Sequence, residues 1–153
     1  MSLRTQIMDE MKTAMKAGDA ARTSALRMIN AAIKQKDIDS RTADNRDGID
    51  DAAILSLLQN MIKQRRDSIA LYEQGGRAEL AAKEQAEIDI IQSFLPAQMS
   101  ADEARAAINS IIAATGAAGM KDMGKVMGAV KDKLAGQFDT AEASKLVKEL
   151  LSA

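Results

Sequence analysis

The chain has 153 residues, 28% of them charged, and its 21 basic and 22 acidic side chains give a formal net charge of −1. It contains neither cysteine nor histidine, which excludes disulfides, thiolate and imidazole metal ligands, and the commonest general base near neutral pH. Aromatic residues make up only 2% of the chain, and Pro96 is its one proline. This composition predicts an all-α protein.

The near-neutral charge also limits the partners that we expect. Neither side of Pro96 carries the basic excess that marks a nucleic-acid binder, so any such contact must come from a local patch. We expect no DNA partner, no metal and no cofactor. The first residues lack the basic-then-apolar run of a signal peptide, and no apolar stretch approaches about 20 residues. We therefore expect a soluble cytoplasmic protein with no membrane partner.

Two helices are predicted at the start of the chain. Ser2 is a suitable N-cap for a helix that ends at Gly18, and Asp19 is placed to cap the next one. Apolar residues recur at helical spacing along both segments. The methionines at positions 8, 11, 15 and 28 are interpreted as core filler, with a Met-rich groove for a partner as the alternative.

Two longer helices follow a break. Residues 37–48 are polar and aperiodic, which predicts a mobile loop. The next helix starts at about Asp50 and continues to Gly75 and Gly76, a strong stop signal. A fourth helix is expected over about 77–95, because it must end before Pro96.

Shorter helices are predicted in the rest of the chain. Two segments begin with capping-box patterns, Ser100-x-x-Glu103 and Asp139-x-x-Glu142, and a further helix lies between them. The complete prediction is an N-terminal four-helix bundle over residues 1–96 and a small C-terminal three-helix domain over residues 97–153.

One arginine falls in the middle of an apolar stripe. Arg65 occupies that position on the third predicted helix, where a charge needs a partner. In an antiparallel hairpin that turns at Gly75 and Gly76, Glu87 lies opposite Arg65, and Glu84 lies one turn away. We therefore expect a structural ion pair of Arg65 with Glu87 or Glu84. This pairing explains the two glutamates better than acid–base chemistry does.

The stretch GMKDMGKVMG, residues 119–128, fits two patterns. Its glycines and Lys125 imitate the start of a phosphate-binding P-loop, but that motif needs a preceding strand and a hydroxyl where Val126 stands. Met123, Val126 and Met127 instead recur at helical spacing. We therefore predict a helix and no nucleotide site.

The glycines within this helix require a reason. Gly124 and Gly128 lie one turn apart beside the apolar stripe, and each interior glycine costs about 0.5–1 kcal/mol relative to alanine. The first interpretation is close packing, most simply against the last helix. The alternative is a notch, rimmed by Lys121, Lys125 and Lys131, that receives an RNA sugar–phosphate backbone.

Three blocks of sequence carry a resemblance to a known family. They are KQRRDSIALYEQGGRAELAAKEQAEIDIIQSFLP, MKDMGKVMGAVKDKLAG and FDTAEASKLVKELL. Together they resemble the YqeY family, which is similar to the C-terminal tail of the B subunit of the glutamine-dependent tRNA amidotransferase. That enzyme converts Glu-tRNA(Gln) or Asp-tRNA(Asn) to the amide.

The resemblance implies a two-part helical fold and a tail that holds tRNA away from any catalytic centre. The matching positions are Lys121, Gly124, Lys125, Gly128 and Gly136. By similarity the chain is linked to carbon–nitrogen ligase activity with glutamine as amido-N-donor. However, the amidase signature of the separate subunit and the cradle domain that activates tRNA have no counterpart in this sequence.

These observations lead to three hypotheses. The leading one is a non-catalytic, tRNA-associated helical module whose partner is tRNA or a tRNA-handling complex. The runner-up is a helical adaptor that docks another protein and contacts no RNA, which the near-neutral charge favours. The third is an amide-transferring enzyme, which would need a catalytic group that neither histidine nor cysteine supplies.

Overall fold

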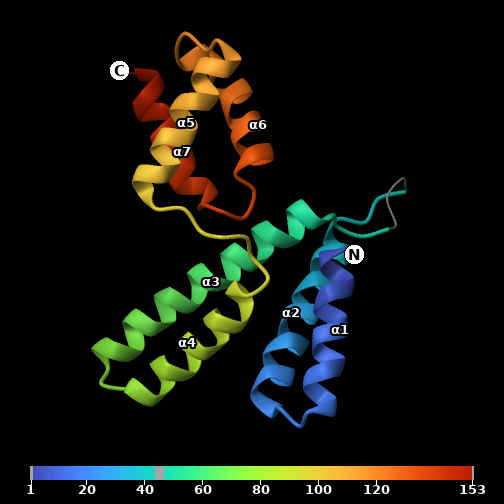
Figure 1. Ribbon diagram of the computed structural model, residues 1–153. Coiled ribbons are helices and arrows are strands. Elements are labelled where there is room, and N and C mark those ends of the chain that lie inside the picture. Colours follow the sequence, from blue (N-terminus) through green and yellow to red (C-terminus); the bar gives the residue numbers. More distant parts are fainter. Residues whose placement is uncertain (1, 44–46, 153) are drawn as a thin grey trace. The chain divides into compact units, whose positions relative to one another are not determined.

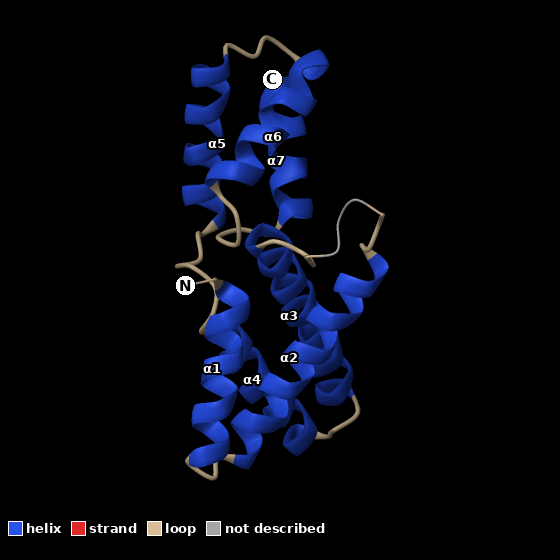
Figure 2. Cartoon of the chain, turned by 90° about the vertical axis from the view of Figure 1, so that its right-hand side faces the viewer, coloured by secondary structure: helices blue, strands red, loops and turns tan. Residues whose placement is uncertain are grey.

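The computed structural model describes residues 2–43 and 47–152. In these ranges the regular structure consists of seven α-helices and one short 3-10 helix, with no strand (Figures 1 and 2). The all-α prediction is therefore confirmed. Backbone contacts divide the chain into two compact units, Met1–Leu95 and Pro96–Ala153, which we call the N-terminal and C-terminal units.

The N-terminal unit contains two helical hairpins. Its helices are α1 (Leu3–Lys16), α2 (Ala20–Asp39), α3 (Asp51–Gln74) and α4 (Ala78–Gln92). The α1–α2 turn contains Gly18 and the α3–α4 turn contains Gly76, each with a φ of 71° that a side chain would disfavour. In Figure 1 the two members of each hairpin lie side by side.

The predicted N-caps of these helices are present. The Ser2 side chain accepts a hydrogen bond from the backbone of Thr5, and Asp19 accepts one from Arg22. Asp50 caps α3 through a 2.9 Å bond from the backbone nitrogen of Ala53. Each cap satisfies a backbone N–H that has no partner within its own helix.

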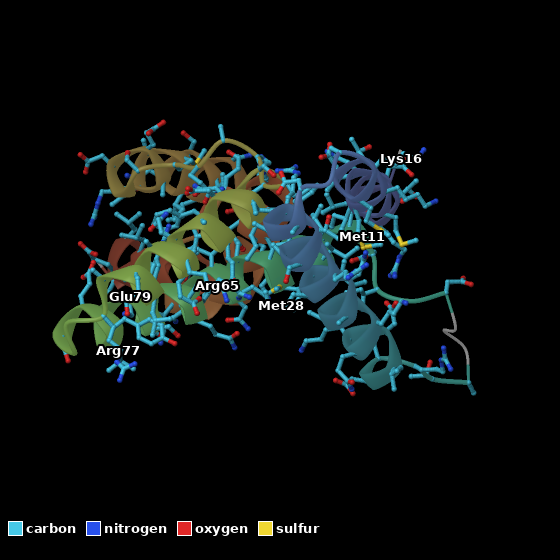
Figure 3. The ribbon with its side chains drawn as sticks, turned by 90° about the horizontal axis from the view of Figure 1, so that it is seen from below. Met11, Lys16, Met28, Arg65, Arg77 and Glu79 are labelled. Atoms are coloured by element: carbon cyan, nitrogen blue, oxygen red, sulfur yellow. The ribbon has the colours of Figure 1, made fainter. Side chains whose placement is uncertain are left out.

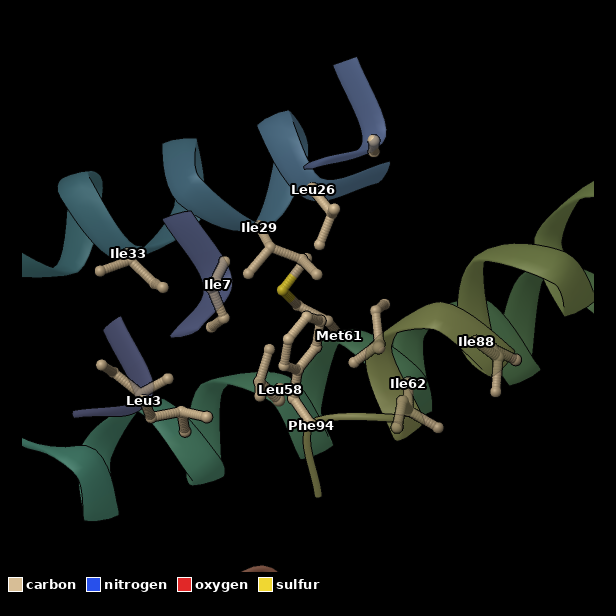
Figure 4. Close-up of a cluster of buried hydrophobic side chains, with 13 residues drawn as sticks. Leu3, Ile7, Leu26, Ile29, Ile33, Leu58, Met61, Ile62, Ile88 and Phe94 are labelled. Atoms are coloured by element: carbon tan, nitrogen blue, oxygen red, sulfur yellow. The ribbon is translucent and has the colours of Figure 1, made fainter. Parts of the chain in front are cut away.

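A single apolar core holds the two hairpins together (Figure 4). All four helices contribute side chains that are 2% exposed or less, including Ile7, Leu26, Ile29, Leu58 and Ile88. Full burial of such a side chain contributes roughly 1.5–3 kcal/mol. Packing of these aliphatic faces, more than intrinsic helix propensity, therefore stabilises the unit.

Three of the four methionines predicted to fill this core lie at its edge. Met8, Met15 and Met28 are 36%, 51% and 38% exposed, whereas Met11 is partly buried against the core. The prediction is wrong for these three. The apolar stripe on each helical wheel is wider than the face that the neighbouring helices cover, so flanking positions remain in contact with water.

The segment predicted as a mobile loop begins later than expected. Helix α2 continues through Asp39, and the side chain of Asp37 is held by α1 and by the backbone of Ile49. The helix persists here because that long-range contact fixes a polar stretch that has no apolar pattern of its own. Residues 44–46 of the predicted loop lie outside the described residues.

The C-terminal unit packs its helices around a second core. Its elements are α5 (Ala101–Thr115), the 3-10 helix η1 (Met120–Asp122), α6 (Met123–Lys133) and α7 (Thr140–Ser152). Ile108 of α5, Val126 of α6 and Val147 of α7 are each 0% exposed. These three helices therefore bury their apolar stripes against one another.

The two predicted capping boxes differ in detail. At α5 both hydrogen bonds are present, from the backbone of Glu103 to the Ser100 hydroxyl and from the backbone of Ser100 to the Glu103 carboxylate. At α7 the carboxylate of Asp139 accepts from the backbone of Glu142 at 3.3 Å, whereas the Glu142 carboxylate lies 3.4 Å from Lys145.

Candidate functional site

The stretch at residues 119–128 is helical from Met120 onward, and the predicted helix is present. Gly119 leads into η1, and α6 begins at Met123. Val126 is fully buried in the core of the C-terminal unit, so the position that would bind magnesium in a P-loop points into a hydrocarbon interior. The described residues that precede Gly119 form no strand. This geometry provides no phosphate-binding loop.

Gly124 and Gly128 do not pack against the last helix, so the first interpretation of this pair is wrong. A Cβ atom built on either glycine would meet nothing within 4 Å, and both residues are exposed. At about 100° per residue they lie on the side of α6 opposite Val126 and Val130, which face the core. Neither glycine has a positive φ. Packing and backbone conformation therefore leave the glycines unexplained.

The three predicted lysines are exposed around these glycines. Lys121 lies in η1 and Lys125 and Lys131 lie in α6, and on the helical wheel they flank the glycine pair. We call these five residues, Lys121, Gly124, Lys125, Gly128 and Lys131, the glycine face. Backbone on this face is unusually accessible, since the glycines add no side chain to cover it.

Lys125 also has a structural contact. Its Nζ donates to the carbonyl oxygen of Thr115 at 2.8 Å, at the C-terminal end of α5. A cation at that position satisfies an orphan carbonyl and interacts favourably with the helix dipole. Lys121 and Lys131 are therefore the lysines best placed to meet a ligand.

Charge is unevenly distributed within the C-terminal unit. The segment from Met120 to Lys133 contains four lysines and two aspartates, although the unit as a whole has seven residues of each sign. One of those aspartates, Asp122, accepts a hydrogen bond from the backbone of Ala118 at 2.9 Å. The glycine face therefore lies in the locally positive part of a neutral unit.

Arg65 lies close to both glutamates that the hairpin register places near it. Its Nε donates to Glu87 at 3.0 Å and lies 3.9 Å from a carboxylate oxygen of Glu84. One of its other two nitrogens donates to the carbonyl oxygen of Met61 at 3.1 Å. The other donates to the sulfur of Met28, also at 3.1 Å. The arginine thereby joins α2, α3 and α4.

A second polar cluster escaped the sequence analysis. Arg4 donates two hydrogen bonds to the carboxylate of Asp37, at 2.7 and 2.8 Å, and a third to the carbonyl oxygen of Ile49. Asp37 also accepts from the backbone of Ile49 at 2.9 Å. The hydrogen bonds from Arg4 hold the pKa of Asp37 below its ordinary value, and the same contact raises the pKa of Arg4.

We call this cluster the Arg4–Asp37 clasp. Gly48 adjoins it with a φ of 91°, and a Cβ atom at that position would lie 2.7 Å from the Asp37 carboxylate. Beside the clasp, Asp51 accepts a 3.2 Å hydrogen bond from the backbone of Leu3. These contacts tie the ends of α1, α2 and α3 together.

The described residues contain no group of three or more acidic, histidine or cysteine side chains arranged to hold a metal ion.

The sequence as a whole matches a family model described as Yqey-like protein over residues 4–151. The chain belongs to the YqeY family. This assignment agrees with the resemblance of the three sequence blocks, and the match covers both structural units.

Named relatives share part of this YqeY sequence. The chain is 35% identical over 95 residues to "Altered inheritance of mitochondria protein 41, mitochondrial" from Lachancea thermotolerans, which covers 62% of this chain and 49% of the relative. The protein of the same name from Eremothecium gossypii is 35% identical over 88 residues, covering 58% and 46%. The chain thus spans about half the length of the curated relatives it matches.

These relatives correct the expected location. The sequence predicts a cytoplasmic protein, but the relatives are named as mitochondrial proteins, so that prediction is wrong. No described helix is long and apolar enough to cross a membrane. Proteins of many compartments share that property, which is why it did not decide the location.

Proposed function

We propose that this YqeY-family chain is a non-catalytic helical module that associates with tRNA or a tRNA-handling complex through the glycine face. The observation that carries the proposal is the exposure of Gly124 and Gly128 on α6, where an added Cβ atom would meet open space. Gly128, in the interior of α6, weakens the helix by about 0.5–1 kcal/mol, and Gly124 in its first turn adds a smaller cost. Close approach of an external backbone gives a reason for that cost, which packing within the unit does not.

The charge around the glycines favours an anionic ligand. Lys121 and Lys131 are exposed on either side of the pair, and lysine contacts a phosphate as a point charge without reading sequence. A sugar–phosphate backbone that lies over the glycines would therefore meet a cation on each side. The resemblance to the amidotransferase tail makes tRNA the first RNA to test.

The decisive test is retention of deacylated tRNA by the purified protein in filter binding over a range of salt concentrations. Retention should be strong at low salt and should fall steeply as salt rises, because phosphate contacts release counterions. The Lys121→Glu, Lys131→Glu double variant should bind tRNA at least about tenfold more weakly. The slope of the logarithm of its binding constant against the logarithm of salt concentration should be smaller in magnitude by about 2.

The matched control is the Lys145→Glu, Lys148→Glu double variant, which makes the same charge change at two exposed positions of α7. It should retain tRNA nearly as well as the unaltered protein. Absence of binding at low salt, or equal loss in the control, would count against the proposal. Capture of a protein partner that survives nuclease treatment would instead support the adaptor hypothesis.

A further inference from the structure

The guanidinium of Arg65 is satisfied unequally by its three acceptors. Its side chain is only 11% exposed, so its N–H groups depend on protein partners more than on water. Glu87 and the backbone of Met61 supply oxygen acceptors, but the third partner is the sulfur of Met28. A thioether is a weak acceptor, and so the contact that joins α2 to the α3–α4 hairpin is the weakest of the three.

The same sulfur belongs to an accessible side chain. Met28 is 38% exposed, whereas Met61, on the core side of Arg65, is 5% exposed. Exposed methionines are the ones that oxidants reach, and oxidation converts the apolar thioether into a polar sulfoxide. Figure 3 shows Met28 and Arg65 next to each other at the edge of the N-terminal unit.

We propose that Met28 is an oxidation site at which a hydroperoxide installs a stronger acceptor for Arg65. The sulfur attacks one peroxide oxygen, the O–O bond breaks and an S–O bond forms. Sulfur loses two electrons, and hydrogen peroxide is reduced to water once the proton on the transferred oxygen has passed to the departing hydroxide. The product is methionine sulfoxide, which reductase enzymes return to methionine.

This modification should strengthen the fold rather than damage it. A sulfoxide usually disrupts a core because its oxygen has no partner there. At Met28 the oxygen forms next to a cationic N–H that already points toward the sulfur, so a charge-assisted hydrogen bond replaces a weak one. The link between α2 and the α3–α4 hairpin becomes tighter, and reduction of the sulfoxide loosens it again.

The test uses the full chain with Met8, Met15 and Met120, three other exposed methionines, replaced by leucine. Limited hydrogen peroxide treatment, followed by peptide mass mapping, should show sulfoxide at Met28 before Met61. Thermal unfolding of the oxidised protein should then occur about 2 to 4 °C higher than before treatment. Methionine sulfoxide reductases should reverse the shift.

Two variants separate this effect from general oxidation. In Arg65→Leu the donor is absent and no new thioether is added, so oxidation at Met28 should leave the melting temperature unchanged or lower it. Met28→Gln, which presents an amide oxygen permanently, should melt above Met28→Leu, which has a similar volume and no acceptor. A lower or unchanged melting temperature on oxidation with Arg65 in place, or no sulfoxide at Met28 before Met61, would overturn the proposal.

Discussion

A charge near an apolar core depends on its partner, and the Arg65–Glu87 pair shows how unequal that dependence is. The arginine side chain is 11% exposed and that of Glu87 is 21% exposed. If the glutamate is removed, the arginine keeps its charge in a poorly hydrated place. If the arginine is replaced by an apolar residue of similar length, Glu87 can still turn part of its carboxylate toward water.

We therefore predict that Arg65→Met destabilises the protein by less than about 1 kcal/mol, whereas Glu87→Leu costs about 2–3 kcal/mol. Urea unfolding of both variants measures the difference. The Arg65→Met, Glu87→Leu double variant should recover most of the loss, because no arginine is then left in this poorly hydrated place without its nearest carboxylate. Equal losses in the two single variants would show that the asymmetry does not exist.

At the scale of the helix, α6 combines two requirements that conflict. Its buried valines at 126 and 130 need a stable helix to hold them in the core, while Gly124 and Gly128 weaken that helix. If the glycines serve only as an opening for a ligand, replacing them should improve the fold and harm binding together. If the glycines have a purely structural role, replacing them should instead lower the stability of the fold.

The Gly124→Ala, Gly128→Ala double variant is accordingly expected to raise the unfolding free energy of the C-terminal unit by about 0.5–1 kcal/mol, mainly through position 128 in the interior of α6. The added methyl groups meet open space, so no clash offsets this gain. Retention of tRNA should fall, because the methyl groups hold a backbone away from α6. The measurements are urea unfolding and filter binding on the same samples.

A useful control for this variant is Ala106→Gly on an exposed position of α5. It should lower stability and leave tRNA retention unchanged, which separates binding from helix stability. Unchanged tRNA retention in the double alanine variant would remove the reason for proposing the glycine face.

The elements themselves were predictable where the determinants are local. The start of a helix is indicated by a capping residue within three or four positions, as at Ser2, Asp19, Asp50 and Ser100. The hairpin register placed Glu87 near Arg65 because a single turn connects their two helices. The Arg4–Asp37 contact gave no such signal, since 33 residues separate its members. For the glycine face the sequence left packing and an exposed notch as alternatives, because a helical wheel does not tell which side a neighbour covers.

At the scale of the whole chain, the two units each have a core of their own. We therefore propose, as the sequence predicts, that residues 1–96 and 97–153 are separate domains. The second fragment is near the lower size at which a core suffices without disulfides or metals, but its three helices pack against one another, and side chains cap the starts of α5 and α7.

Expressed separately, both fragments should show helical circular dichroism and a cooperative thermal transition. The full chain, denatured with urea, should give transitions that match those of the fragments. A C-terminal fragment that is helical only in the full chain would show that the units depend on each other, and the domain boundary would then be wrong.

The Arg4–Asp37 clasp has a consequence for the order in which the N-terminal unit assembles. Its contact between Asp37 and Ile49 spans 12 residues, whereas the contact between Arg4 and Asp37 spans 33. Closing the longer loop costs about 0.9 kcal/mol more in chain entropy. During folding, the Asp37 carboxylate at the end of α2 should therefore first bind the backbone of Ile49, which precedes α3. Arg4 of α1 should bind Asp37 afterwards.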